Sequence, residues 1–138
     1  MFTAAEVEYL KTQRTGRLAT VSPAQQPDVA PVGYLFDGET FTIRGIDLAK
    51  TLKYLNTKRG SERAAFVIDD YETADTSRPR GVKIHGRAEI VSDGDREAIR
   101  VTPSRKWSWG INAPMFQDGR RVIERPSQRG NEDGAASR

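Results

Sequence analysis

The sequence predicts a mainly β fold of the α+β kind, a small barrel of about six antiparallel strands with two or three short helices. Short runs with a period of two recur along the chain, whereas the 3.6-residue period of a helix occurs in few places. A chain of 138 residues fits one domain without disulfides. We therefore expect one barrel domain over residues 1–116 and a flexible tail over residues 117–138, where apolar residues become sparse.

The composition excludes several classes of protein. Cysteine is missing and His85 is the single histidine, which disfavours disulfide frameworks, thiol nucleophiles, bound metals and most Ser-His enzymes. The 22 basic residues exceed the 19 acidic ones, and the resulting charge of +3 favours an anionic partner. No apolar run approaches the roughly 20 residues of a membrane span, and the first residues lack the basic region of a signal peptide. A cytoplasmic location is expected.

The first expected element is a helix over residues 3–13. Thr3 is placed to cap its N-terminus, and Glu6, three residues later, completes a capping box. Phe2 and Val7 have the spacing of a hydrophobic staple. These signals define where the helix begins.

Three strands follow in the sequence. Apolar or alternating runs predict strands over residues 17–21, 29–36 and 40–44. A proline-containing segment, residues 22–27, separates the first two, and an Asp-Gly turn separates the second from the third. We expect these strands to form an antiparallel meander.

A second helix is expected over residues 47–59. The hydrophobic period changes at Asp47, which is placed to cap the helix, and Gly60 follows its end. Its apolar face consists of Leu48, Thr51, Leu52 and Leu55.

Further strands complete the expected barrel. Residues 64–68 are almost continuously apolar, which indicates a strand buried on both faces, and a polar loop follows over residues 69–80. Residues 82–90 alternate as in a half-buried strand. After a turn or short helix at residues 92–95, the last strand is expected over residues 99–102.

The familiar catalytic signatures are missing from the sequence: it contains no glycine-rich phosphate or dinucleotide loop, no Gly-x-Ser-x-Gly and no His-Glu-x-x-His. Such a chain is suited to bind a cofactor whose chemistry is intrinsic. Lys50, Thr51 and Lys53 lie early in the second helix, where the dipole and free N–H groups favour a phosphate. The alternative is a solvated helix face.

Two further clusters are candidates for ligand binding. Arg78 and Arg80 flank a proline before the most regular strand, where they can bind an anion or remain solvated in a turn. Trp107 and Trp109 can form a wall for a planar ligand, or they can pack in the core or at an interface. His85 is expected to be a surface residue, because nothing near it in the sequence would orient it.

Several segments, taken in order, resemble one known family. They are Gly16–Val21, Gln26–Pro27, Ala30–Gly33, the helix with Lys50, Arg78–Ala88, Ile99–Pro103 and Ser108–Gly110. Their order and spacing resemble the pyridoxamine 5'-phosphate oxidase-like flavin/deazaflavin oxidoreductases, and more narrowly their F420-dependent branch. The resemblance extends from about Phe2 to Ile111.

The resemblance implies a split β-barrel like that of FMN-binding proteins, which forms a homodimer with cofactor grooves at the subunit interface. It implies F420 as the cofactor, with FMN as the alternative. The ring would then lie against Pro31, Val32, Gly33, Arg44 and Gly45. The phosphate would meet Lys50, Thr51 and Lys53, and the partner subunit would contribute Arg78 and Arg80 or Trp107 and Trp109.

The activity implied is hydride transfer between F420 and an electron-poor small-molecule acceptor, with Tyr34, His85, Lys53 or solvent as the proton donor. One alternative is an FMN- or haem-binding member of the same superfamily. Another is a carrier that binds F420 without oxidising it. A nucleic-acid-binding barrel is less favoured, because the net charge is modest and the strands lack evenly spaced aromatic residues.

Overall fold

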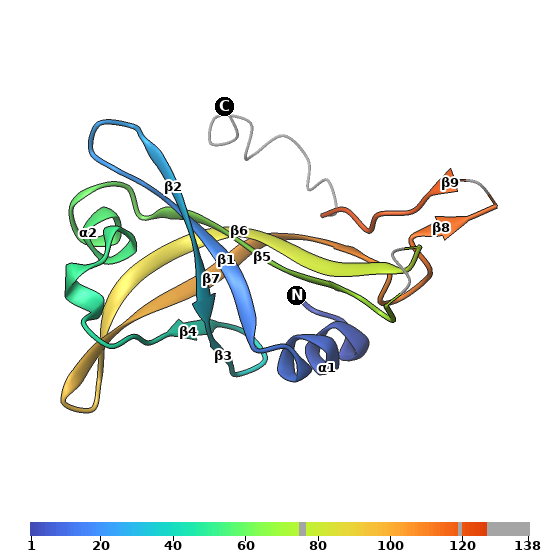
Figure 1. The fold of residues 1–138 in the computed structure, drawn as a ribbon, viewed down its shortest axis with the longest axis horizontal. Coiled ribbons are helices and arrows are strands. Elements are labelled where there is room, and N and C mark those ends of the chain that lie inside the picture. Colours follow the sequence, from blue (N-terminus) through green and yellow to red (C-terminus); the bar gives the residue numbers. More distant parts are fainter. Residues whose placement is uncertain (75–76, 119, 127–138) are drawn as a thin grey trace.

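The computed structural model describes residues 1–74, 77–118 and 120–126 (Figure 1). Within them lie the helices α1 (Ala4–Thr12) and α2 (Leu52–Arg59) and a short 3-10 helix, η1 (Leu48–Lys50). The strands are β1 (Thr15–Val21), β2 (Pro27–Gly33), β3 (Leu35–Phe36), β4 (Phe41–Ile43), β5 (Arg63–Tyr71), β6 (Pro79–Asp93), β7 (Arg96–Trp109), β8 (Phe116–Gln117) and β9 (Arg120–Arg121). The predicted mainly β class is confirmed.

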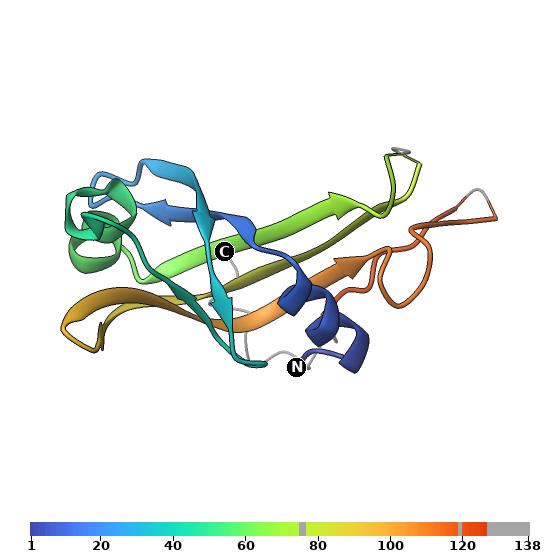
Figure 2. The same cartoon turned by 60° about the horizontal axis from the view of Figure 1, so that its bottom comes forward.

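Strands β1 to β7 form one antiparallel sheet in the order β2-β1-β5-β6-β7-β4-β3. Only Tyr34 separates β2 from β3, so the two ends of this order belong to one stretch of chain that closes the sheet into a barrel (Figures 1 and 2). β2 pairs with β1, and β4 pairs with β3 and β7, but β2 and β4 do not pair with each other. The barrel is therefore split between β2 and the chain that follows β4. The split β-barrel expected from the sequence is confirmed.

The predicted meander is wrong in its middle strand. Residues 29–36 divide at Tyr34, so that the first part pairs with β1 and the second with β4. The strand divides there because Tyr34 packs against the core: its ring lies edge-on to Phe41 and Phe66, at centroid distances of 5.5 and 5.6 Å. A run with a period of two predicts which face is buried, but it does not show with which neighbour each half pairs.

Aromatic and branched side chains fill the barrel. Phe41 and Phe66 are fully buried and pack edge-on with centroids 5.2 Å apart. Burial of one such side chain stabilises the fold by about 1.5–3 kcal/mol. Helix α1 packs Leu10 into the same core, and its capping box between Thr3 and Glu6 is formed as predicted.

The second helix begins later than predicted. Asp47 has a left-handed backbone (φ 54°) and its side chain caps nothing, whereas the Thr51 hydroxyl accepts the N–H of Tyr54 and caps α2. The predicted apolar face is also wrong at Leu52, which is 60% exposed. Tyr54 and Asn56 are buried instead, because their polar groups find partners. Asn56 donates to the hydroxyl of Thr20 on β1 at 3.1 Å.

Strands β5, β6 and β7 are longer than their apolar patterns predicted. The loop expected over residues 69–80 is shortened, because β5 continues through Tyr71 and β6 begins at Pro79. Strand β5 alternates between buried and partly exposed side chains rather than being buried on both faces. The last predicted strand, residues 99–102, is the centre of a strand that reaches Trp109. The polar ends of β6 and β7 remain in the sheet because the two strands pair with each other there.

The C-terminal segment contacts the barrel in its described part. Strands β8 and β9 pair with each other, and the backbone of Glu124 exchanges two hydrogen bonds with Ser108 on β7, at 2.8 and 3.0 Å. Residues 127–138, which make up most of the expected flexible tail, lie outside the described residues. In the part of the chain that is described, no helix is long and apolar enough to cross a membrane.

Candidate functional site

The predicted ring-binding residues lie on the two sides of the split. Pro31, Val32 and Gly33 belong to β2, and Arg44 and Gly45 directly follow β4. The edge of β2 that faces away from β1 has no sheet partner. β4 itself pairs with β3 and β7 on its two sides, and the chain leaves the sheet after it, at Arg44 and Gly45. Val32 is buried, whereas Pro31 and Gly33 are exposed. The split thus offers a polar backbone edge to a flat molecule.

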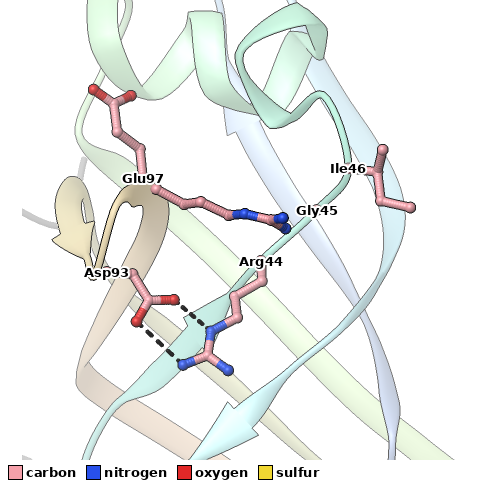
Figure 3. A pocket seen from close by; sticks show the side chains of 6 residues that line it. Arg44, Gly45, Ile46, Asp93 and Glu97 are labelled. Carbon is pink, nitrogen blue, oxygen red and sulfur yellow. Dashed lines mark hydrogen bonds and ion pairs between the residues drawn. The ribbon is translucent and has the colours of Figure 1, made fainter.

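A pocket of about 270 Å³ adjoins Arg44 and Gly45 (Figure 3). It is lined by Arg44, Gly45 and Ile46 after β4 and by Asp93, Arg96 and Glu97 at the turn between β6 and β7. The Arg44 guanidinium donates to both oxygens of Asp93, at 2.5 and 3.1 Å. This bidentate pair joins the end of β4 to the β6–β7 turn. The pocket includes two of the predicted residues and none of the others.

Lys50 and Lys53 are the cations of the predicted site that remain unpaired, since neither forms an ion pair with a carboxylate of the described residues. Lys50 ends η1, and Lys53 lies in the first turn of α2. Thr51 between them serves the helix: its hydroxyl donates to the carbonyl of Leu48 at 2.6 Å and accepts the N–H of Tyr54. The hydroxyl proton of Thr51 is therefore already in use.

Arg80 and Arg78 differ in how firmly they are held. The Arg80 guanidinium forms a bidentate pair with Asp70, at 2.7 and 3.0 Å, and lies 5.0 Å from the ring centroid of Tyr9. Tyr9 donates to the same carboxylate at 2.9 Å. Burial opposes ionisation of Asp70, but hydrogen bonds from Arg80 and Tyr9 lower its pKa overall. Arg78 is more exposed and lies 3.7 Å from Glu72. Arg80 thus supports the fold, and its charge is already balanced.

Trp107 and Trp109 point to the outer face of β7 and are partly exposed. The Trp107 ring has Lys83 at 4.3 Å and Arg105 at 5.3 Å from its centroid, and His85 meets it edge-on. Partial burial, and then the charges of Lys83 and Arg105, lower the pKa of His85. His85 is exposed, as predicted. Trp109 covers Gly81, where any side chain would clash with the indole.

Tyr34, one of the predicted proton donors, is partly buried against the core. Its hydroxyl donates to the carbonyl of Leu10 at 2.5 Å, and burial raises its pKa. The hydroxyl proton is therefore already held by the backbone.

The predicted site residues do not form one cluster. One group lies beside the β6–β7 turn and on the chain that follows β4: Arg44, Gly45, Lys50, Thr51 and Lys53. A second group, Arg78, Arg80, Trp107 and Trp109, lies toward the other end of β6 and β7. Pro31 on β2 is in the same row of the sheet as Trp107, with β1, β5 and β6 between them. Lys83, which is opposite Trp107, and Asp93, which binds Arg44, are separated by ten residues of β6, or about 33 Å of strand. One ring-sized ligand in one chain does not reach both groups.

The β6–β7 turn brings to the site residues that no sequence pattern indicates. Asp93, Arg96 and Glu97 lie in or directly after residues 92–95, for which the sequence predicts only a turn or short helix. Their approach to Arg44 follows from the register of β4 on β7, where Ile43 is opposite Ile99. No local pattern signals this register. A second hollow, lined by arginines of residues 120–125, lies in the C-terminal segment and includes none of the predicted residues.

The fold and the site together define a split-barrel protein with an open strand edge on β2 and a pocket beside Arg44 and Gly45 after β4. Comparisons with known proteins agree with this class. Residues 3–121 match the family model described as pyridoxamine 5'-phosphate oxidase. The chain belongs to that family, as the resemblance in its sequence implied.

The relatives give further context. A 5a,11a-dehydrotetracycline/5a,11a-dehydrooxytetracycline reductase of Streptomyces rimosus is 37% identical over 124 residues, covering 83% of this chain and 87% of the relative. A conserved hypothetical protein from Mycobacterium tuberculosis is 25% identical with a TM-score of 0.65, covering 87% of this chain and 94% of that one. An FAD-binding protein from Mycobacterium smegmatis is 21% identical with a TM-score of 0.58 over 76% of this chain and 91% of that chain, and shows the shared fold.

Proposed function

We propose that the chain is an F420-dependent oxidoreductase that transfers a hydride between the deazaflavin and an electron-poor small-molecule acceptor. The observation that carries the proposal is the open edge of β2 at the split, together with Lys50 and Lys53 on the helices that follow β4, neither of which forms an ion pair with a carboxylate of the described residues. The reductase from Streptomyces rimosus, similar over most of its length, supports the reaction type.

The residues at the split fit a flat, anionic cofactor. Backbone groups of Pro31–Gly33 and of Arg44–Gly45 are placed to hydrogen-bond the polar rim of a fused ring from two sides. At the start of α2, the N–H groups of Leu52 and Lys53 have no hydrogen-bond acceptor among the described residues. These two donors, the helix dipole and the ammonium groups of Lys50 and Lys53 suit a phosphate.

The chemistry would be divided between cofactor and protein. When bound, the deazaflavin supplies the hydride; FMN is the alternative group for the same edges. The chain itself binds and orients: the Arg44–Asp93 pair fixes the end of β4, and the Thr51 cap fixes the start of α2. Both supports are formed before any ligand arrives, which reduces the ordering needed on binding.

A second copy of the chain is part of the proposal. The outer face of β1, β2 and β5 presents apolar side chains that neither helix covers: Ala19, Val21, Val29, Ala65 and Val67. Helix α1 bonds to inward-facing groups of β7, and α2 bonds to the inward-facing Thr20. Packing this face against a second copy would bury it and would bring the two groups of site residues from different chains together.

The acceptor we propose is a polycyclic ketone with an activated C=C bond. This class follows from the dehydrotetracyclines in the name of the Streptomyces rimosus reductase. Hydride addition to such a bond also consumes one proton, and solvent reaches the exposed pocket beside Arg44.

Titration of the purified protein with F420, followed by cofactor fluorescence, tests the proposal. Loss of a charge-assisted phosphate contact costs about 1.5–3 kcal/mol, so Lys50→Ala and Lys53→Ala should each raise the Kd by about tenfold or more. Lys11→Ala, on the exposed side of α1, is the matched control and should leave the Kd unchanged. Absence of F420 binding, or an undiminished affinity in both variants, would contradict the proposed site. A yellow protein with a flavin spectrum would favour FMN.

A further inference from the structure

We infer that the pocket between the end of β4 and the β6–β7 turn binds the acceptor, and that it selects acceptors in which an anionic group adjoins an apolar ring. The inference rests on the proposed function, because it names the substrate class of the same site. It follows from the way in which the charges lining the pocket are paired.

One of the two arginines of the pocket is already neutralised. Arg44 donates through two nitrogens to the two oxygens of Asp93, and Figure 3 shows this pair closing one side of the pocket. Bidentate arginine–carboxylate pairs are the most strongly oriented ion pairs in proteins. Arg44 therefore forms a fixed wall, and its charge is balanced.

The second acidic residue of the pocket directs its charge toward α2. Glu97 accepts the hydroxyl of Tyr54 at 2.5 Å, and the carboxylate points away from Arg44 toward the helix (Figure 3). Lys58 donates to the same hydroxyl at 3.2 Å, and this hydrogen bond raises the pKa of the lysine. The negative charge of Glu97 is thus balanced outside the pocket by Lys58, through the hydroxyl of Tyr54.

Arg96 is the lining residue whose charge remains uncompensated. It is exposed and forms no ion pair with a carboxylate of the described residues. Its planar guanidinium matches the two oxygens of a carboxylate or of an ionised 1,3-dicarbonyl. An anionic ligand would supply the missing partner.

The rest of the pocket is apolar and small. Ile46 is among the lining residues, and its side chain lies beyond Gly45 on the side away from Asp93 (Figure 3) and is 91% exposed, so a ligand ring that reaches it removes apolar surface from water. The volume of about 270 Å³ is at the lower limit for ligand sites and accommodates part of a polycycle rather than a whole nucleotide-like cofactor. Gly45 lines this pocket and also belongs to the segment against which the cofactor ring is proposed, so the two proposed ligands would be neighbours.

Binding measurements on the cofactor-free protein test this assignment. The probes are tetracycline, a polycycle with an ionised 1,3-dicarbonyl group, and α-tetralone, a neutral bicyclic ketone. We expect Arg96→Gln to raise the Kd for tetracycline about tenfold while the Kd for α-tetralone changes less than twofold. Arg100→Gln removes the same charge from an exposed position of β7 outside the pocket, and it should change neither Kd. Ile46→Asp is a second variant at an exposed position and should also weaken tetracycline binding.

The outcomes separate this inference from the proposed function. An unchanged tetracycline Kd in Arg96→Gln, or no binding by the unmodified chain, overturns the acceptor pocket. A rise in the F420 Kd of Arg96→Gln as large as that for tetracycline also overturns it, because the arginine would then hold the cofactor. If F420 fails to bind while tetracycline binding depends on Arg96, the cofactor proposal falls and the pocket assignment is supported.

Discussion

The carboxylate of Glu6 provides the sharpest test of how this fold is held together. Glu6 is fully buried, and its two oxygens accept four hydrogen bonds. The donors are Ser108 at 2.6 Å, the backbone N–H of Thr3 at 2.9 Å, Asn112 at 3.0 Å and the ammonium group of Lys106. The network joins α1 to the end of β7 and to the loop after it.

We predict that Glu6→Gln destabilises the protein by about 3 kcal/mol, because breaking one side of a buried ion pair costs about 3–5 kcal/mol and the size of the side chain is kept. The glutamine offers one acceptor oxygen where the carboxylate offers two, so some of the four donors lose their partner. Lys106 retains Glu124 at 3.2 Å, which places the value at the lower end of the range. With a urea m value of about 2 kcal/mol/M, the midpoint should fall by roughly 1.5 M.

Urea unfolding followed by tryptophan fluorescence measures this effect. Glu8→Gln, on the exposed side of the same helix, is the matched control and should change the free energy of unfolding by less than about 0.5 kcal/mol. A loss below 1 kcal/mol in Glu6→Gln, or one equal to that of the control, would refute the reasoning.

The pH dependence of stability gives an independent check on Glu6. Burial raises the pKa of this carboxyl, but the hydrogen bonds from Lys106, Ser108, Thr3 and Asn112 outweigh burial and lower it below its ordinary value of 4.5. The stabilisation is therefore complete above pH 4.5 and is lost as the pH falls through the folded-state pKa. Glu6→Gln lacks this contribution, so the difference between the two proteins should shrink in acid.

The remaining predictions concern Arg80 and the second copy of the chain. Asp70→Asn should cost about 1–2 kcal/mol at neutral pH, because Arg80 and Tyr9 lose a charged acceptor. Because hydrogen bonds lower the folded-state pKa of Asp70, this cost, measured by urea unfolding, should shrink as the pH falls below 3.8. Light scattering should give twice the chain mass for the unmodified protein and the single-chain mass for Val67→Asp, which places a charge on the proposed interface; a single-chain mass for both would contradict the dimer.

The start of the chain was predictable because its signals are local. The capping box at Thr3 and Glu6 uses residues three apart, and the structure forms it as expected. Similarly, the alternation of residues 82–90 gives a strand with one buried face. These patterns alone do not require the sheet to close into a barrel. The split barrel was expected from the family resemblance.

Errors arose where a signal was local but the deciding contact was distant. Aspartate often caps helices, but Thr51 rather than Asp47 caps α2. Leu48 packs into the core and Asp47 has a left-handed backbone, so the helix begins later. Arg80 resembled a free cation until its pairing with Asp70 was visible. The charge of a side chain is local information, but its availability to a ligand depends on the neighbours that folding supplies.

The sequence by itself determined the class of fold, the cap of α1 and the buried face of β6, because hydrophobic period, turn chemistry and capping act between residues close together in the chain. Only the tertiary structure decided that residues 27–36 pair on both sides of the split, that Asp93 and Arg96 line one pocket with Arg44, and that Trp107 and Trp109 lie toward the other end of β6 and β7. These features depend on strand register and on pairing between distant segments, for which a sequence pattern of period two contains no information.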